Sequence, residues 1–217
     1  MTGKVPADAP SRRAEVLARL VAALVDRPAS SAVPRDYQYR LPDHVDVLDL
    51  FAERVADYRS TVHRTDAAGI GATVAAALAD RGIRRLVVPE GIPEGWLAAS
   101  PVERIGDDPP LSVEELDGID GTITGCAVAI AETGTFVLDA GSGQGRRVLS
   151  LLPDRLICVV TADQVVGTVP EALARLDPAR PQTWVSGPSA TSDIELERIE
   201  GVHGPRLLDV ILVDRPG

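Results

Sequence analysis

The chain has 217 residues, of which 45% are hydrophobic and 3% aromatic, and its formal net charge at pH 7 is −10. This length allows one large domain with a helical extension, and the negative charge argues against nucleic-acid binding, which requires a positive surface. The only lysine is Lys4, so a Schiff-base lysine and a Walker lysine are excluded from the rest of the chain.

The N-terminal part predicts an extension followed by a main domain. Residues 1–40 are expected to form a tail, one helix and a proline-rich linker, because Ser11 can cap a segment with apolar residues at helical spacing. Residues 41–217 are expected to form an α/β domain. Its first helix, with Asp43 as the expected N-cap, repeats apolar residues at every fourth position from Val47.

From residue 60 onward the pattern predicts strands that alternate with helices. Helices are expected from Ile70 to near Gly82, within 112–120, and over 146–153 and 162–177. The segments expected to form strands are STVHRT at 60–65, RRLVVPEG at 84–91, PVERIGD at 101–107, TITGCAVAIAETGTFVLDAG at 122–141, RLICVVT at 155–161, PQTWVSGPS at 181–189 and PRLLDVILVD at 205–214.

The order of these segments predicts the fold class. Strands that alternate with helices, several of them with unbroken apolar runs, indicate a three-layer α/β fold with a mostly parallel sheet and helices on both faces. Sheets of this kind bind ligands in the crevice beyond the carboxyl ends of their strands. We therefore expect polar side chains at strand ends to form a crevice there.

The segment ETGT at 132–135 interrupts an apolar strand, where Gly134 permits a kink or bulge. Glu132 borders the apolar run AVAIA, and burial there would raise the pKa of an isolated carboxylate. Glu132 is therefore a candidate acid, base or nucleophile, with Thr133 and Thr135 as hydroxyls that orient a ligand. The alternative is a β-bulge whose glutamate reaches solvent or pairs with an arginine.

The segment GSGQGRR at 141–147 is rich in glycine but matches neither the G-x-G-x-x-G pattern nor a Walker loop. It favours a flexible turn that brings Arg146 and Arg147 to the start of a helix. One of these arginines is a candidate to clamp a carboxylate or phosphate through two hydrogen bonds.

The segment WVSGPSATSDIE at 184–195 combines a strand end with an excess of hydroxyl groups. A helix after the Gly-Pro turn, capped by a hydroxyl and with carboxylates in its first turn, accounts for part of the pattern. One helix needs one cap, so the remaining hydroxyls and amides also predict a site for a ligand such as a hydroxy acid or sugar acid. The positions singled out as binding residues are Ser186, Gly187, Ser189, Thr191, Asp193 and Glu195.

The segment GVHGP at 201–205 places His203 and Gly204 just before the last strand. A histidine changes its charge near neutral pH, so His203 is a candidate catalytic residue facing the crevice. The alternative is a turn histidine bonded to backbone. A Ser–His–Asp triad of Ser189, His203 and Asp193 is not supported, because GPSATSD does not match a G-x-S-x-G elbow.

Metal and cofactor sites are not predicted on this chain. Cys126 and Cys158 lie in apolar runs and are expected to be buried free thiols, with a disulfide or a reactive thiol as alternatives. Without C-x-x-C or H-x-x-x-H spacing, an iron–sulfur cluster has no ligand set and a zinc site is not expected. The N-terminus lacks an apolar signal segment and no long apolar run follows, so a cytoplasmic protein is expected.

Four ordered segments, AIAETGTFVL, GRRVLSLLPDRLICVV, SGPSATSDIELERIEGVHGP and LLDVILVD, resemble the LUD-domain family of lactate-utilization proteins. The resemblance covers residues 40–214. It implies a fold similar to the NagB/RpiA/CoA-transferase-like proteins and a part in the bacterial oxidation of L-lactate to pyruvate. It also implies a set of three proteins in which iron–sulfur clusters lie on the partners and not on this chain.

The resemblance also marks positions of the candidate site, and Ala190 departs from the basic or amide side chain that relatives carry there. The recurrent positions correspond to Glu132, Thr133, Gly134 and Thr135, to Arg146 or Arg147, to Ser186 through Ser189 with Thr191, Asp193 and Glu195, and to His203 through Pro205.

Three functions are compatible with this sequence. The first is an accessory subunit of lactate oxidation that binds a small hydroxy acid or other anion and iron–sulfur partner proteins. The second is a stand-alone enzyme, CoA-transferase-like or isomerase-like, that uses Glu132 as nucleophile or base. The third is a sensing module that binds carboxylates without turnover. A homo-oligomer is compatible with each of them.

Overall fold

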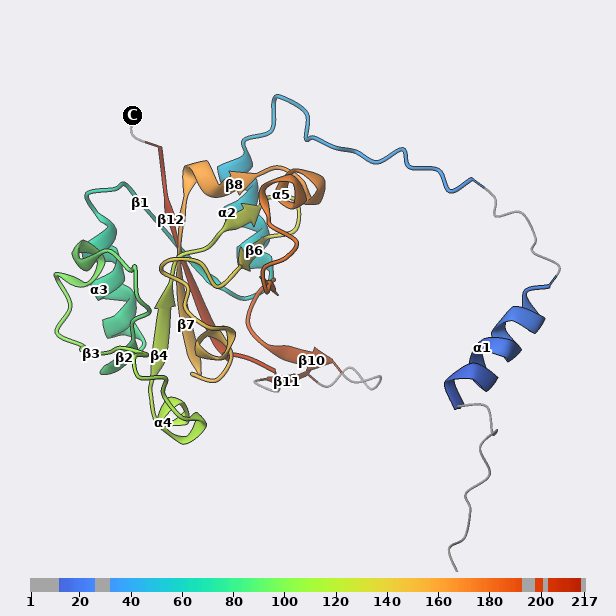
Figure 1. Ribbon diagram of the computed structural model, residues 1–217. Helices are drawn as coiled ribbons and strands as arrows, with labels where there is room; N and C mark the ends of the chain where they lie inside the picture. Colours follow the sequence, from blue (N-terminus) through green and yellow to red (C-terminus); the bar gives the residue numbers. More distant parts are fainter. Residues whose placement is uncertain (1–11, 26–31, 193–197, 201–202, 216–217) are drawn as a thin grey trace, which may run out of the picture. The chain divides into compact units, whose positions relative to one another are not determined.

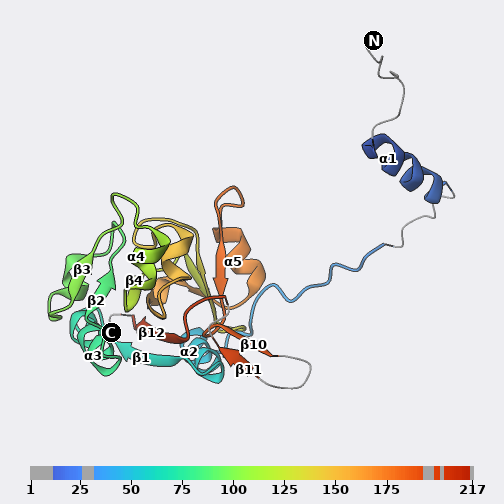
Figure 2. The same cartoon turned by 90° about the horizontal axis from the view of Figure 1, so that it is seen from below.

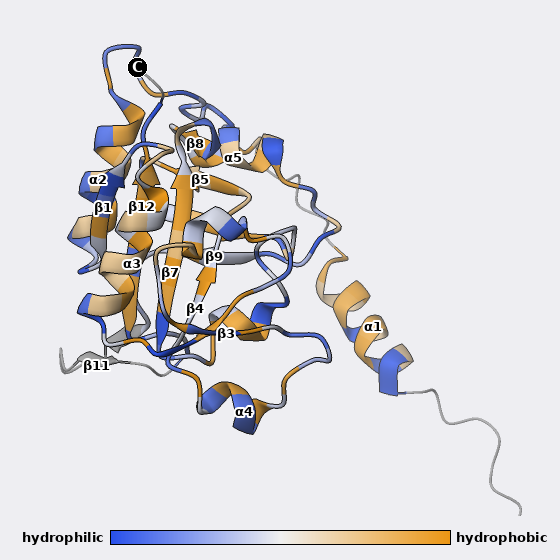
Figure 3. Cartoon of the chain, turned by 90° about the vertical axis from the view of Figure 1, so that its left-hand side faces the viewer, coloured by the Kyte–Doolittle hydropathy of each residue, from blue (hydrophilic) through white to orange (hydrophobic). Residues whose placement is uncertain are grey.

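The computed structural model describes residues 12–25, 32–192, 198–200 and 203–215, and the chain divides into two units, 1–37 and 38–217. The first unit contains helix α1 (Arg12–Ala23), which by itself has no buried residue. Its apolar side chains give it the largely orange ribbon of Figure 3. The expected cap, Ser11, lies outside the described residues. The large apolar side chains of α1 that are more than half exposed are Val16, Leu17, Leu20 and Val21.

The second unit is built on a six-stranded sheet in which every pair of neighbours is parallel (Figure 1). Its longest strands, Arg155–Thr161 and Leu207–Val213, lie in apolar segments that were expected to form strands, whereas the segment RRLVVPEG contributes a strand of only three residues. In spatial order the strands are β1 (Thr61–Thr65), β12 (Leu207–Val213), β7 (Arg155–Thr161), β4 (Gly121–Thr124), β2 (Arg85–Val87) and β3 (Glu103–Ile105).

One face of this large sheet is covered by α3 (Ile70–Asp80) and η1 (Glu94–Leu97). Successive residues of a strand point to opposite faces, so Ile157 of β7 packs on the α3 side while Cys158 packs on the other side. Val74 of α3 is fully buried in the first layer. Each such aliphatic side chain stabilises the fold by about 1.5–3 kcal/mol.

The opposite face is covered by helix α2 (Val47–Asp57) together with a second, four-stranded sheet. Phe51 of α2 and Phe136 of the small sheet are both buried against the large sheet. The predicted three-layer α/β fold is therefore confirmed, with a small sheet sharing the second outer layer. In spatial order the strands of the small sheet are β8 (Val165–Val166), β5 (Val128–Ile130), β6 (Thr135–Leu138) and β9 (Thr183–Val185).

The apolar region 122–141, expected as one central β region, is divided between the two sheets. β4 ends at Thr124 in the large sheet, whereas β5 and β6 form an antiparallel hairpin in the small sheet. The expected break at 132–134 is the hairpin turn. Gly134 lies there at φ 59°, and a Cβ atom would lie 2.6 Å from the carbonyl carbon of Arg54, so the turn requires glycine.

Two helix predictions were wrong. The first joined η3 (Ala162–Gln164), β8 and α5 (Val169–Arg175) into one helix. Thr168 is instead the N-cap of α5, and its backbone N–H donates to Oε2 of Glu171 at 3.0 Å. Pro170 lies in the first turn of this helix. The shorter helices α4 (Val113–Asp117) and η2 (Arg147–Ser150) lie where short helices were expected.

The second wrong prediction placed a helix after Pro188. The chain instead forms β10 (Ala190–Ser192), which pairs antiparallel with β11 (Arg198–Glu200) near the start of β12 (Figures 1 and 2). The backbone N–H of Ser189 donates to the carbonyl oxygen of Pro205, at 2.8 Å, so strand-like pairing begins one residue before β10. The β-branched Thr191 also favours a strand over a helix.

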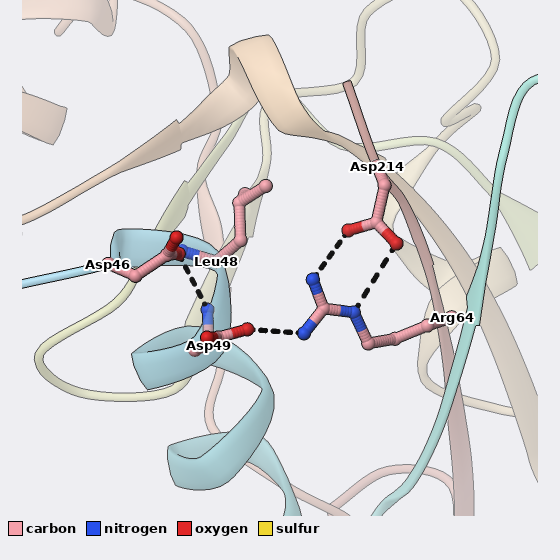
Figure 4. A network of polar contacts seen from close by, with 5 residues as sticks. All are labelled: Asp46, Leu48, Asp49, Arg64 and Asp214. Atoms are coloured by element: carbon pink, nitrogen blue, oxygen red, sulfur yellow. Dashed lines mark hydrogen bonds and ion pairs between the residues drawn. The ribbon is translucent and has the colours of Figure 1, made fainter. Parts of the chain in front are cut away.

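The amino end of α2 is fixed by aspartates, although the expected cap Asp43 is not the one used (Figure 4). Asp46 Oδ1 accepts from the backbone N–H groups of Asp49 and Leu48, at 3.1 and 2.8 Å, and these bonds hold the pKa of Asp46 below its usual value. Arg64 of β1 binds Asp49 and also Asp214, at 2.6 Å. These contacts tie α2 to the carboxyl ends of β1 and β12.

An ion pair between Arg81, the C-cap of α3, and the buried Asp209 joins this helix to the amino-terminal half of β12. Asp209 of β12 is 2% exposed and accepts from Nε of Arg81, at 2.9 Å. Nε2 of His63 lies 2.9 Å from the other carboxylate oxygen. Because a buried carboxylate is costly when it has no partner, these contacts are part of what fixes α3 to β12.

Candidate functional site

Three segments that are distant in sequence enclose a cavity of about 240 Å³, here called the hydroxyl cavity. They are the strand and turn 183–189, the turn 203–205 and the segment from the end of η2 to the start of β7, which contributes Ser150, Leu151 and Leu156. The side chains that give the cavity its polar wall are those of Ser150, Thr183, Ser186, Ser189 and His203. The remaining wall is apolar and comes from Leu151, Leu156, Trp184, Val185, Pro188 and Pro205.

The position of the hydroxyl cavity differs from the expected one. The cavity follows the carboxyl end of β9, but in the large sheet it adjoins Leu156 near the amino end of β7 and Pro205 just before β12. The prediction of a crevice at the carboxyl ends of the large sheet is therefore wrong for these residues. The reason is that SGPS follows a strand of the small sheet, which the sequence pattern did not separate from the large one.

Ser189 and His203 are brought together by backbone hydrogen bonds. The N–H of His203 donates to Oγ of Ser189 at 3.0 Å, while the N–H of Ser189 donates to the carbonyl oxygen of Pro205 at 2.8 Å. His203 is exposed, and within the described residues its imidazole has no hydrogen-bond partner. The ring is therefore available to a ligand, and Gly204 lines the same cavity.

A chain of hydroxyl groups leads from the ETGT turn to the hydroxyl cavity. Thr133 Oγ1 donates to Thr135 Oγ1 at 2.8 Å, and Thr135 Oγ1 lies 2.6 Å from Oγ of Ser186. Antiparallel pairing of β6 with β9 sets Thr135 opposite the end of β9, which explains why these hydroxyls meet. Thr135 is buried and Ser186 lines the cavity, so the hydrogen bond with Thr135 orients the Ser186 hydroxyl from the protein interior.

The turn that carries Ser186 is fixed against the end of α2. Gly187 has φ 82°, and a Cβ atom there would lie 2.5 Å from Cβ of Tyr58. Both the left-handed backbone and the close approach require glycine. Gly187 therefore positions the cavity wall by packing, and because it also lines the cavity, the ligand contact expected of it stays a prediction.

Glu132 does not have the environment that made it a catalytic candidate. It is exposed in the turn between β5 and β6, and its backbone N–H donates to the carbonyl oxygen of Gly167 at 3.0 Å. Its side chain is not among those that line the hydroxyl cavity. The alternative expectation, a glutamate that reaches solvent, fits Glu132, because the residue lies in the hairpin turn and not within the buried strands β5 and β6.

The two candidate arginines lie outside the hydroxyl cavity. Arg146 holds Asp107 through two bonds, at 2.6 and 2.8 Å, and also donates to the carbonyl oxygen of Leu111. This pairing lowers the pKa of Asp107 and raises that of Arg146. Arg147 is exposed beside a small hollow that shares Ser150 and Thr183 with the hydroxyl cavity.

The glycine-rich loop 141–145 borders a different site, here called the acidic cavity. It consists of two adjoining hollows of about 470 and 580 Å³ that share Glu90 and Gly145. Val88 and Gly106 place it beyond the carboxyl ends of β2 and β3. Its charged side chains are those of Glu90, Asp107, Asp108 and Arg146, of which sequence reasoning had singled out only the arginine.

Some expected residues lie where their side chains cannot be placed. Asp193 and Glu195 are outside the described residues, and of Thr191 and Ala190 the structure gives only the strand β10. Cys126 and Cys158 are buried free thiols, as predicted, and the contact with Cys158 and burial raise the pKa of Cys126 well above its usual value. Among the described residues, no group of three His, Cys, Asp or Glu side chains is arranged to hold a metal ion.

The described part of the chain also contains no helix long and apolar enough to cross a membrane. The parallel sheet, the second sheet and the hydroxyl cavity together define an α/β domain with a partly polar cavity. The LUD domain family matches residues 113–213 of this chain.

Relatives with known names extend this match. The chain is 51% identical over 172 residues to "Lactate utilization protein C" of Deinococcus radiodurans, covering 77% of this chain and 80% of that protein. A protein of the same name from Shouchella clausii is 32% identical over 114 residues, only 49% of each chain. One from Bacillus subtilis is 31% identical over 141 residues, covering 61% of this chain and 57% of that protein.

A solved structure agrees with the fold. The crystal structure of a DUF162 family protein from Deinococcus radiodurans superposes with a TM-score of 0.66 at 45% sequence identity. The superposition covers 77% of this chain and 96% of that chain. The chain therefore belongs to the LUD domain family, and the predicted family is confirmed.

Proposed function

We propose that this chain is an accessory subunit in the bacterial oxidation of L-lactate to pyruvate, and that its hydroxyl cavity binds a small hydroxy acid. The observation that carries the proposal is the 51% identity, over 77% of the chain, to a relative named "Lactate utilization protein C". The cavity supplies the second support, because its polar wall matches the groups of such an acid.

The chemistry of the polar wall suits a molecule with one carboxylate and one hydroxyl. Ser186 and Ser189 carry hydroxyls, which both donate and accept, and so complement an alcohol group. When protonated, the imidazole of His203 can donate to a carboxylate, and a hydrogen bond to a charged group contributes about 1.5–3 kcal/mol. The ligand's carboxylate would thus lie toward His203 and its hydroxyl toward the serines.

The proposed partners are iron–sulfur proteins of the same oxidation, since this chain is proposed to supply a binding function and not electron transfer. Helix α1 supports a protein partner. Val16, Leu17 and Leu20 lie at helical spacing, so the helix taken by itself has an apolar side. Such a side needs a covering surface, and the proposal assigns that surface to a partner protein.

Calorimetry with L-lactate tests the ligand part of the proposal. We expect heat of binding for the wild-type chain, and about tenfold weaker binding for His203→Ala because one charged hydrogen bond is lost. His44→Ala is the matched control, since His44 is also exposed but does not line the cavity. Absence of binding by the wild type, or equal losses in both variants, would contradict the proposal.

Copurification tests the partner part. A tagged chain from cells growing on lactate should retain cysteine-rich iron–sulfur proteins, identified by mass spectrometry and by their visible absorption. Leu20→Asp places a charge on the apolar side of α1 and should reduce their recovery, whereas Arg19→Asp changes the charged side and serves as control. Recovery of the wild-type chain alone would count against an accessory role.

A further inference from the structure

The volume of the hydroxyl cavity exceeds what lactate fills. A cavity of about 150 Å³ accommodates benzene, which like lactate has six non-hydrogen atoms. The hydroxyl cavity has about 240 Å³. On the same scale, of roughly 25 Å³ per non-hydrogen atom, it holds nine or ten such atoms. Lactate would therefore leave space for about three or four carbon atoms.

The two walls of the cavity differ in chemistry. Hydroxyls and the imidazole of His203 lie on the turns 183–189 and 203–205, whereas Leu151 and Leu156 come from the other side of the cavity, at η2 and β7. Val185 of β9 adds apolar surface, because it packs against the same apolar cluster as Leu156 and lines the cavity. A ligand with one polar end and one apolar end complements both walls.

We infer that the hydroxyl cavity prefers 2-hydroxy acids with a branched aliphatic side chain of about four or five carbons over lactate itself. This inference rests on the proposed function, because it assumes the same cavity and the same polar contacts. The 2-hydroxy acid group occupies the serine and histidine wall. The side chain fills the space beside Leu151 and Val185 that the methyl group of lactate leaves empty.

The size of the preference follows from the burial of added carbons. Each methylene moved from water into an apolar site contributes a factor of about four in affinity. A three-carbon extension, as in 2-hydroxy-4-methylpentanoate, should therefore bind about 60-fold more tightly than lactate. The gain should level off near 3-phenyllactate, because the cavity is open to solvent and carbons beyond the nine or ten non-hydrogen atoms that it holds stay in water.

Isothermal titration calorimetry of the full chain with a graded series measures this directly. The series is L-lactate, 2-hydroxybutanoate, 2-hydroxy-3-methylbutanoate, 2-hydroxy-4-methylpentanoate and 3-phenyllactate. The control ligand is 4-methylpentanoate, which has the branched chain without the hydroxyl group. Leu151→Asn should reduce the ratio of branched-acid to lactate affinity by about tenfold, because it makes the apolar wall polar. A thermal melt of this variant checks that it is folded.

The outcomes separate the inference from the function on which it rests. Affinity that rises along the series to the branched six-carbon acid supports the inference, and does so even if lactate itself binds too weakly to measure. Equal affinity for lactate and the larger hydroxy acids overturns the inference and leaves the proposed function standing. Equal binding of 4-methylpentanoate and its 2-hydroxy form overturns the ligand class. No heat with any acid overturns the inference and the proposed ligand together.

Discussion

The hydroxyl cavity and the acidic cavity lie at different ends of the large sheet and differ mainly in charge. The hydroxyl cavity offers serines and an imidazole, with no carboxylate among its described lining residues. In the acidic cavity Arg146 is already bound to Asp107, and the structure gives neither Glu90 nor Asp108 an ion pair within the described residues. A ligand carboxylate would be repelled there, at a cost of about 1 kcal/mol per charge at 4 Å in water.

If the hydroxyl cavity is the acid site, as proposed, then position in the sheet does not by itself identify such a site. The acidic cavity has the position expected of α/β sheets, beyond the carboxyl ends of β2 and β3. The hydroxyl cavity has the chemistry expected of a hydroxy-acid site, although it adjoins the amino ends of β7 and β12. Charge and hydrogen-bonding groups therefore decide between the two cavities.

The largest expected effect concerns two glycines, one in the wall of the hydroxyl cavity and one in the loop that borders the acidic cavity. Gly187→Ala should destabilise the fold by about 3 kcal/mol, because it adds a clash with Tyr58 to a left-handed backbone. Gly143→Ala, in the loop beside the acidic cavity, keeps 3.4 Å to its nearest neighbour and should cost about 1–2 kcal/mol from its backbone alone. Urea unfolding of both variants measures the difference, and equal losses would show that the SGPS turn is not held by α2.

The next effect separates the cavities by ligand binding. His203→Ala should weaken L-lactate binding about tenfold, whereas Asp108→Asn at the acidic cavity should leave it unchanged. Fluorescence of Trp184, which lines the hydroxyl cavity, offers a second readout of the same titration. A loss in Asp108→Asn and not in His203→Ala would assign the acid to the other cavity.

A smaller effect concerns the pH dependence of the acidic cavity. Arg146 lowers the pKa of Asp107, so this pair stabilises the fold above the ordinary pKa of an aspartate and the contribution is lost as the pH falls through the lowered pKa. Asp107→Asn should cost about 1 kcal/mol at pH 7, reduced by the partial exposure of Arg146. Unfolding curves at pH 7 and below pH 3 should show the wild type and variant converging at low pH. A difference in the free energy of unfolding between wild type and variant that stays the same at both pH values would mean that the Arg146–Asp107 pair does not cause the pH dependence.

The smallest expected effect is that of Glu132. Because it is exposed and does not line the hydroxyl cavity, Glu132→Gln should change lactate affinity less than twofold and stability by less than about 0.5 kcal/mol. Growth on lactate of a strain that carries this variant gives the functional counterpart. Loss of growth with unchanged binding would restore the stand-alone enzyme as the better explanation.

The sequence predicted those elements whose pattern depends on burial alone. The strands β7 and β12 are continuous apolar runs, and helix α3 repeats apolar residues at helical spacing, so each was expected with nearly its observed bounds. The N-cap of α2 was expected at Asp43 and lies at Asp46. The sequence could not decide between them, because both aspartates precede the same apolar repeat.

The failures depend on pairing between distant residues. Serines and threonines suit both helix caps and extended strands, and only the pairing of Ala190–Ser192 with Arg198–Glu200 decides for β10. Arg146 pairs with Asp107, 39 residues earlier, in a segment that showed no chemical motif. The candidate residues Ser186, Ser189 and His203 do share one cavity, whereas Glu132 was misjudged because its apolar neighbours belong to a strand that ends before it.

The most direct measurement is the mapping of backbone amide chemical shifts in the ¹⁵N-labelled chain during titration with L-lactate. Ligand in the hydroxyl cavity should shift the amides of Ser186, Gly187, Ser189, His203 and Gly204, and leave those of Glu90, Gly143 and Asp107 in place. Shifts confined to the residues around the acidic cavity, or no shifts at saturating lactate, would contradict the central claim that the hydroxyl cavity is the hydroxy-acid site.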